Sequence, residues 1–112
     1  MKRVVITGLG AITPIGNNLE AYNEGLKNGV SGADIITRFD ASLFKTKFAC
    51  EVKNFNPDDF IDRKDARRMD LFTQFAMVCA DEALADSKLL DYNELDFDRI
   101  GVIWGSGIGG LR

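Results

Sequence analysis

The stretch Asp98-Arg-Ile-Gly-Val-Ile-Trp-Gly-Ser-Gly-Ile-Gly-Gly110 joins a short apolar run to a loop that has four glycines in six residues. The β-branched residues that end at Trp104 predict a strand buried on both faces. The glycines that follow let the backbone approach a ligand or another chain where any β-carbon would clash. Only Leu111 and Arg112 come after the loop. We therefore expect these residues to be the beginning of a larger fold, with later elements lying outside the 112 residues.

The rest of the chain alternates predicted strands with predicted helices. Strands are expected at 3–7, 48–52 and 99–104, a capped amphipathic helix from Asn18 to about Lys27, a short turn of helix after Asn56, and an extended surface loop over 31–47. The longest predicted helix runs over 62–87, and its apolar residues lie on nearly every side, which is typical of a central helix. This alternation predicts an α/β fold with a parallel or mixed sheet. No repeat or linker divides the sequence, so we expect one partial domain over residues 1–112.

Composition excludes several classes of function. The chain is 46% hydrophobic and 28% charged with a formal net charge of −3, which argues against a general nucleic-acid binder. It has no histidine, the commonest metal ligand and the commonest general base near neutral pH. Cys50 and Cys79 lie in apolar sequence without metal-site spacing and are expected to be reduced and buried. We therefore expect no catalytic residue, metal or cofactor within the chain, no membrane segment, and a cytoplasmic location.

Two glycine clusters each follow a predicted strand. Gly105-x-Gly107-x-x-Gly110 has the spacing of a dinucleotide-binding loop, but too little sequence follows to form the helix and acidic residue which that site needs. In the first cluster, Gly8-x-Gly10, a proline and a glycine soon interrupt the required helix. Tight turns that allow close packing are the alternative for both clusters. Ser106 has no histidine to activate it and is expected to be structural.

Cations crowd the start of the long predicted helix, where the helix dipole favours anions. Arg63, Lys64, Arg67 and Arg68 all lie within its first turns, with aspartates beside them. One interpretation is a salt-bridged, solvated face. The other is an anion-docking site, because three- and four-residue spacing would place Lys64, Arg67 and Arg68 on one helical face.

Five stretches together resemble a known family over nearly the whole chain and in the family's order. They are Arg3-Val-Val-Ile-Thr-Gly-Leu-Gly-Ala-Ile-Thr-Pro-Ile-Gly16, Arg38-Phe-Asp40, Lys47-Phe48, Asp62-Arg-Lys-Asp-Ala-Arg-Arg-Met-Asp70 and Gly105-Ser-Gly-Ile-Gly-Gly-Leu111. They closely resemble the N-terminal part of the bacterial β-ketoacyl-acyl carrier protein synthase II family. The resemblance implies the incomplete N-terminal part of a thiolase-like layered α/β fold with a mixed sheet, in a homodimer. It also implies fatty acid elongation by decarboxylative Claisen condensation of an acyl-enzyme with malonyl-acyl carrier protein. In that family a cysteine, two histidines and a lysine carry out the reaction, and this chain does not contain the motifs that hold them.

The resemblance assigns roles to four residues of this chain. Lys64, Arg67 and Arg68 match the family's basic patch for the acidic acyl carrier protein, and Ile108 matches a residue lining the acyl-chain pocket near the dimer interface. The expected function is that of a 3-oxoacyl-acyl carrier protein synthase, with the 112 residues alone inactive. A binding module that takes a carrier protein or an acyl chain without chemistry is the alternative, and a nucleotide-binding fragment ranks last.

Overall fold

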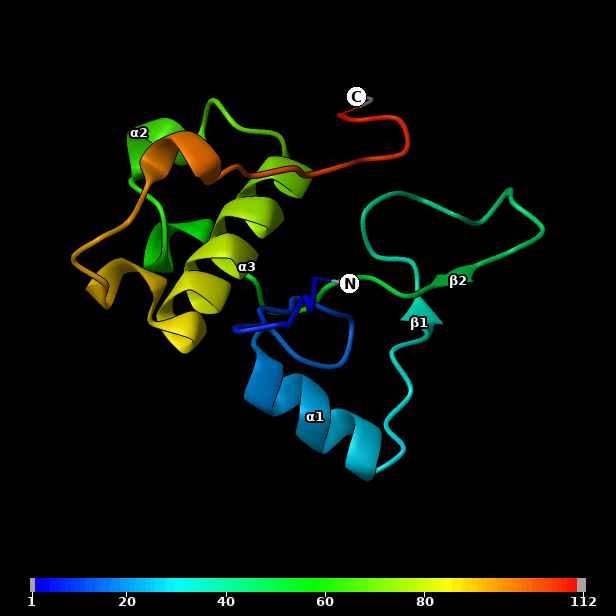
Figure 1. The fold of residues 1–112 in the computed structure, drawn as a ribbon. Coiled ribbons are helices and arrows are strands. Elements are labelled where there is room, and N and C mark those ends of the chain that lie inside the picture. The colour runs from blue at the N-terminus through cyan, green and yellow to red at the C-terminus, as the bar shows by residue number, and fades with distance from the viewer. Residues whose placement is uncertain (1, 111–112) are drawn as a thin grey trace. The chain divides into compact units, whose positions relative to one another are not determined.

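The computed structural model describes residues 2–110. Leu111, the last residue of the glycine motif quoted above, lies outside them. The described residues form two compact units, one of residues 2–10 and 56–110 and the other of residues 11–55 (Figure 1). In chain order the elements are α1 (Leu19–Lys27), β1 (Asp34–Ile35), β2 (Phe48–Ala49), η1 (Pro57–Asp59), α2 (Arg63–Ala66), α3 (Leu71–Ser87), η2 (Leu89–Asp91) and η3 (Phe97–Arg99).

Helix α1 of the 11–55 unit confirms the helix predicted after Asn18. The Asn18 side chain accepts a 2.8 Å hydrogen bond from the Ala21 N–H, which satisfies one of the free donors of the first turn. The helix ends at Lys27, and Gly29 follows with a φ of +62°, a left-handed conformation that favours glycine. Local capping signals therefore fix both ends of this helix.

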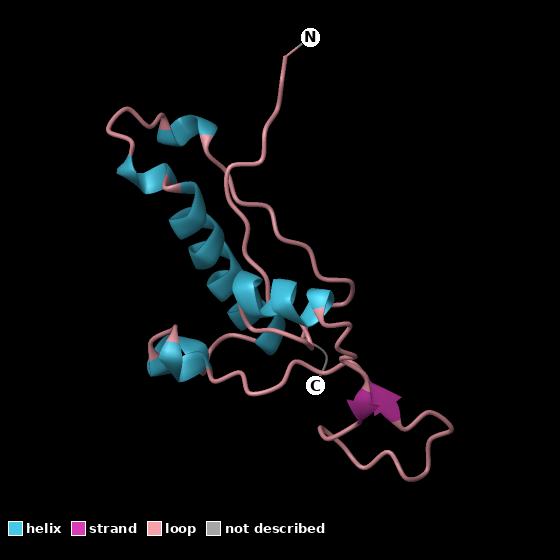
Figure 2. Ribbon diagram, turned by 90° about the horizontal axis from the view of Figure 1, so that it is seen from below, coloured by secondary structure: helices cyan, strands magenta, loops and turns pink. Residues whose placement is uncertain are grey.

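A two-stranded antiparallel sheet is the second feature of the 11–55 unit. Asp34 pairs with Ala49, Ile35 pairs with Phe48, and the Ile36 N–H extends the ladder by donating to the Lys47 carbonyl at 3.0 Å. Figure 2 shows the two short strands and the long loop that joins them. The sequence predicts strand β2 but places β1 in a surface loop, which is wrong. The expectation that Cys50 is buried is also wrong, because this cysteine just after β2 is exposed.

The helix predicted over 62–87 is interrupted in the structure. Helix α2 ends at Ala66, and α3 begins only at Leu71. The Gln74 side-chain amide donates to the carbonyls of Ala66 (2.9 Å) and Met69 (3.3 Å), which a continuous helix would pair with backbone N–H groups. A side chain inserted into the backbone ladder in this way breaks the helix into two.

Helix α3 is central to its unit, as predicted. Val78 and Cys79 are buried on it, and the glycine cluster of residues 8–10 packs against it. A β-carbon placed on Gly10 would overlap the Cys79 carbonyl group. The intervening Leu9 N–H donates to the Asp86 carboxylate at 2.9 Å. The first glycine cluster therefore permits close backbone packing, which was one of its two interpretations.

Residues 3–7 and 99–104, which the sequence predicts to be strands, do not form strands in the structure. Within residues 2–110 the β1–β2 pair is the one sheet, so the structure does not contain the mixed sheet that the sequence predicts. Ile6 is 82% exposed and Ile103 is 98% exposed. A buried strand needs strands beside it and helices over its faces, and residues 2–110 do not provide them.

Among the helices of residues 2–110, none has both the length and the apolar character that a membrane-spanning segment requires.

Candidate functional site

The predicted docking cations lie in and just after the short helix α2. Lys64 is within the helix, Arg67 is its C-terminal cap with φ −67° and ψ −18°, and Arg68 lies in the turn that follows. The prediction that the three share one helical face is therefore wrong, because the helix ends before Arg67. All three are nevertheless exposed and lie within five consecutive residues. We call Lys64, Arg67 and Arg68 the basic cluster.

The ion pairs around the basic cluster distinguish its two interpretations. Arg63 lies 3.7 Å from the Asp58 carboxylate, so this neighbouring cation has a partner. No ion pair within residues 2–110 involves Lys64, Arg67 or Arg68. The nearby carboxylate of Asp62 instead accepts a 2.8 Å hydrogen bond from the Lys64 backbone N–H and caps α2. The salt-bridged reading thus fits Arg63, whereas the basic cluster keeps its charge available to an anionic partner.

The loop of residues 105–110 carries Ile108, which is 79% exposed. The Gly109 N–H donates to the Ser106 hydroxyl at 3.2 Å, so this serine takes a structural role in the turn. Gly109 has a φ of +83°, a backbone conformation that residues with a side chain rarely adopt. None of residues 105–110 is helical, so the structure gives a dinucleotide phosphate no helix N-terminus in this loop.

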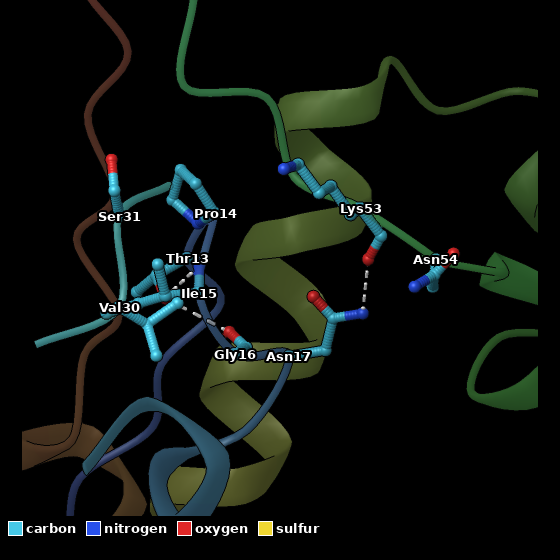
Figure 3. A pocket seen from close by; sticks show the side chains of 9 residues that line it. All are labelled: Thr13, Pro14, Ile15, Gly16, Asn17, Val30, Ser31, Lys53 and Asn54. Atoms are coloured by element: carbon cyan, nitrogen blue, oxygen red, sulfur yellow. Dashed lines mark hydrogen bonds between the residues drawn. The ribbon is translucent and has the colours of Figure 1, made fainter. Parts of the chain in front are cut away.

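A separate pocket of about 310 Å³ lies within the 11–55 unit (Figure 3). The Asn17 amide donates to the Lys53 carbonyl across it at 2.8 Å, and the Lys53 ammonium is paired with the Asp34 carboxylate at 2.9 Å. Sequence reasoning missed this pocket because three separate segments form it, and only Pro14 and Gly16 signalled an irregular turn there. The residues that line it are Thr13, Pro14, Ile15, Gly16, Asn17, Val30, Ser31, Lys53 and Asn54.

The pocket offers hydroxyl and amide groups and one cation that already has a carboxylate partner. It contains none of the residues that the sequence analysis selected, and no histidine, cysteine or carboxylate side chain is among the residues that line it. Among residues 2–110 no group of three histidine, cysteine, aspartate or glutamate side chains is arranged to hold a metal ion. The basic cluster and the loop of Ile108 therefore remain the candidate functional features.

Two carboxyl groups near the β1–β2 sheet have pKa values below their ordinary values. Hydrogen bonds from Thr37, whose hydroxyl donates to Glu51 at 2.7 Å, lower the pKa of that glutamate. The hydrogen bond from the Lys53 side chain, aided by the Ile35 N–H, lowers the pKa of Asp34. Both carboxylates therefore have hydrogen-bond partners within the 11–55 unit.

The family model and two curated proteins that match this chain all represent β-ketoacyl synthases. Residues 1–112 match the family model of the β-ketoacyl synthase N-terminal domain. A 3-oxoacyl-[acyl-carrier-protein] synthase 2 from Synechocystis sp. is 55% identical over 111 residues, and one from Staphylococcus aureus is 56% identical over 111 residues. Each alignment covers 99% of this chain but only 26% and 27% of the respective relative. The chain thus spans about a quarter of the length of the curated relatives it matches.

Solved structures similar to this chain are also ketosynthases. The ishigamide ketosynthase/chain length factor has a TM-score of 0.69 and 41% identity, over 76% of this chain and 21% of that chain. A type II PKS acyl-carrier protein in complex with its ketosynthase bound to the hexaketide has a TM-score of 0.58 and 26% identity, over 90% and 23%. With the family model matching every residue, the chain belongs to the β-ketoacyl synthase family, and its match lies in the N-terminal domain of that family.

Proposed function

We propose that residues 1–112 contribute the N-terminal part of a 3-oxoacyl-acyl carrier protein synthase that elongates fatty acyl chains. In that reaction malonyl-acyl carrier protein loses carbon dioxide, and its C2 carbon forms a bond to the acyl carbonyl carbon as the enzyme thiol leaves. The family match over the whole chain and the identity to the two synthases support this proposal. We further propose a cytoplasmic homodimer with the thiolase-like layered fold, in which residues 3–7 and 99–104 become strands of a mixed sheet.

The part that this chain plays is recognition of the acyl carrier protein. The observation that carries this proposal is the basic cluster, whose three cations are exposed and have no ion pair within residues 2–110. The chain as a whole has a net charge of −3, so an acidic partner is repelled by most of the sequence and attracted locally. A local attraction of this kind orients the partner and speeds association. The carrier protein is the acidic partner that the family's reaction requires.

The second part that we propose for the chain is a wall of the acyl-chain pocket. Ile108 is a large apolar side chain held out on a glycine-rich loop, and it is 79% exposed. A β-branched side chain is stiff, so it gives a pocket a defined width. An acyl chain that covers Ile108 would gain the free energy of burying its apolar surface.

Binding of a fluorescently labelled acyl carrier protein tests the docking role. The variant is Lys64→Glu with Arg68→Glu, and the matched control is Lys45→Glu with Lys47→Glu, two exposed cations that also have no ion pair within residues 2–110. Exposed ion pairs contribute about 0.2–1 kcal/mol each, and a reversal replaces an attraction with a repulsion. Two reversals should therefore cost about 1–4 kcal/mol, a fivefold or greater loss of affinity, with salt weakening the native interaction. Equal losses in variant and control would overturn the docking site.

The same binding assay separates the proposed function from the alternative of a binding module without chemistry. Both predict that the chain binds the carrier protein. Only the proposed function predicts that a complete chain containing these 112 residues makes 3-oxoacyl product, with a rate that falls when Lys64 and Arg68 are reversed. A complete chain that binds the carrier and makes no product would favour the binding module.

A further inference from the structure

Asp70 precedes the longest helix but does not cap it. The residues before α1, η1, α2 and η3 each accept a hydrogen bond from a backbone N–H of the following turn. Asp70 has the extended backbone of a cap, with φ −66° and ψ 156°, yet its side chain makes no capping bond to α3. Aspartate is among the residues that cap helices best. The Asp70 carboxylate therefore does not serve α3 as a cap.

The Asp70 carboxylate lies against the backbone of Gly110. A β-carbon placed on Gly110 would overlap this carboxylate and would lie 2.7 Å from its Oδ1 atom. The other glycines of the loop differ, because β-carbons at Gly105, Gly107 and Gly109 would have no heavy atom within 4 Å. Figure 1 shows the C-terminal segment passing the first turn of α3. Of the loop's four glycines, only Gly110 packs closely against another part of its unit.

The turn that holds Asp70 also holds the basic cluster. The Gln74 amide ties the carbonyls of Ala66 and Met69 to α3, so the turn between α2 and α3 is fixed at both ends. Arg67 and Arg68 lie in this turn, directly before Met69 and Asp70. A short and well-bonded connection thus joins the docking cations to the residue that contacts the loop.

We propose that Asp70 is a positioning residue: its carboxylate contacts Gly110 and so restrains the end of the 105–110 loop, two residues after Ile108, beside the start of α3. A loop with four glycines loses much conformational entropy when it is ordered, so a contact that restrains its end should change how often it opens. The importance of this for acyl chains rests on the proposed role of Ile108 in the pocket. The contact itself does not depend on that role.

A mutant cycle measured on the 112-residue chain tests the contact. Amide hydrogen exchange of Gly109, whose N–H donates to the Ser106 hydroxyl, reports loop opening, and quenching of Trp104, the single tryptophan, is an independent readout. Asp70→Ala removes the carboxylate that Gly110 packs against, and Gly110→Ala places a methyl group in its space. Each should speed exchange about tenfold, within the range expected for disturbing a close contact. In the double variant the second change should add nothing, because the methyl group then occupies the space of the missing carboxylate. Gly107→Ala is the matched control and should leave exchange unchanged.

The outcomes separate positioning from a general effect on folding. Asp70→Asn keeps the side-chain shape and one acceptor oxygen, and its exchange should stay closer to the native rate than that of Asp70→Ala. The helical circular dichroism signal should be preserved in Gly110→Ala, since this change does not touch the helix ladder. Additive effects in the double variant, an equal effect of Gly107→Ala, or a native loop that exchanges as fast as an unfolded peptide would each overturn the proposal.

A carrier-protein titration distinguishes failure of this inference from failure of the proposed function. If the carrier binds the native chain and Trp104 quenching changes only while Asp70 is present, the turn links docking to the loop. If the carrier binds and quenching does not change, the link is refuted while docking stands. If the carrier does not bind at all, the proposed function fails, and the mutant cycle still decides whether Asp70 positions the loop.

Discussion

Replacing Gly10 with alanine should loosen helix α3. The backbone of residues 8–10 packs so closely on α3 that a methyl group at Gly10 would overlap the Cys79 carbonyl and would lie 3.1 Å from the Ala83 nitrogen. Both are backbone atoms, so no side-chain rotation relieves the overlap. Gly10 has no positive φ, and the backbone conformation itself therefore accepts alanine. The effect of the substitution should come from lost packing alone.

The magnitude follows from the cost of overpacking a close contact, which is about 1–3 kcal/mol. Separating the two segments also weakens the hydrogen bond from the Leu9 N–H to the Asp86 carboxylate. Local opening of α3 should then become easier by about 1–3 kcal/mol, a drop of about 5- to 150-fold in the protection of its amides. Amide hydrogen exchange measured by NMR on residues 75–87 gives this protection directly.

Gly101→Ala supplies the control, because a β-carbon there has no atom within 4 Å and its φ is not positive. In open loops such a change leaves the folded state unharmed and restricts the unfolded chain, which stabilises by about 0.4–1 kcal/mol. The two substitutions should therefore differ in sign. Equal protection in Gly10→Ala and Gly101→Ala would refute the close packing of residues 8–10 on α3.

Three further outcomes are expected. The 112-residue chain should self-associate as its concentration is raised, because Ile6 and Ile103 are 82% and 98% exposed. Sedimentation that shows a monodisperse monomer at every concentration would count against this. The chain should yield no 3-oxoacyl product from acyl- and malonyl-carrier protein, and product above the no-enzyme background in a mass-spectrometric assay would contradict it. Glu51, whose pKa is lowered by Thr37, should stabilise the 11–55 unit above its unfolded pKa and lose that contribution as pH falls through the lowered value. A side-chain NMR titration should show Thr37→Val raising the pKa of Glu51, and an unchanged pKa would exclude the hydrogen bond as the cause.

Local signals in the sequence were sufficient for the helix ends. Asn18 caps α1, which ends at Lys27, and a short helix η1 follows Asn56, as the sequence predicts. These features depend on hydrogen bonds between residues two or three positions apart. The apolar pattern of residues 71–84 likewise predicts the central position of α3, where Val78 and Cys79 are buried.

Features that depend on distant residues were not predictable. The break between α2 and α3 arises from the Gln74 side chain reaching back eight residues to the Ala66 carbonyl, and no local propensity announces it. Strand β1 is only two residues long and is ordered by its pairing with Phe48 and Ala49. The strands predicted at 3–7 and 99–104 show the reverse case, since their composition is that of buried strands but residues 2–110 supply no neighbours.

The candidate site likewise combines residues that the sequence identifies with an arrangement that it does not predict. The sequence identifies the cations Lys64, Arg67 and Arg68 but assumes a continuous helix, which would have placed them on one face. The structure shows them on a helix end and the turn after it. The contact of Asp70 with Gly110 joins residues forty positions apart, so only the structure reveals it.

Docking of the acyl carrier protein can be observed residue by residue, by chemical-shift mapping of the isotopically labelled chain during titration with the carrier. We expect the shifts to concentrate on residues 63–70, to reach the loop of residues 105–110, and to fade as salt is raised from about 0.1 to about 1 M, where the screening length falls from about 10 Å to about 3 Å. Shifts that centre on other residues, or that persist unchanged at high salt, would contradict docking of the carrier protein by the basic cluster.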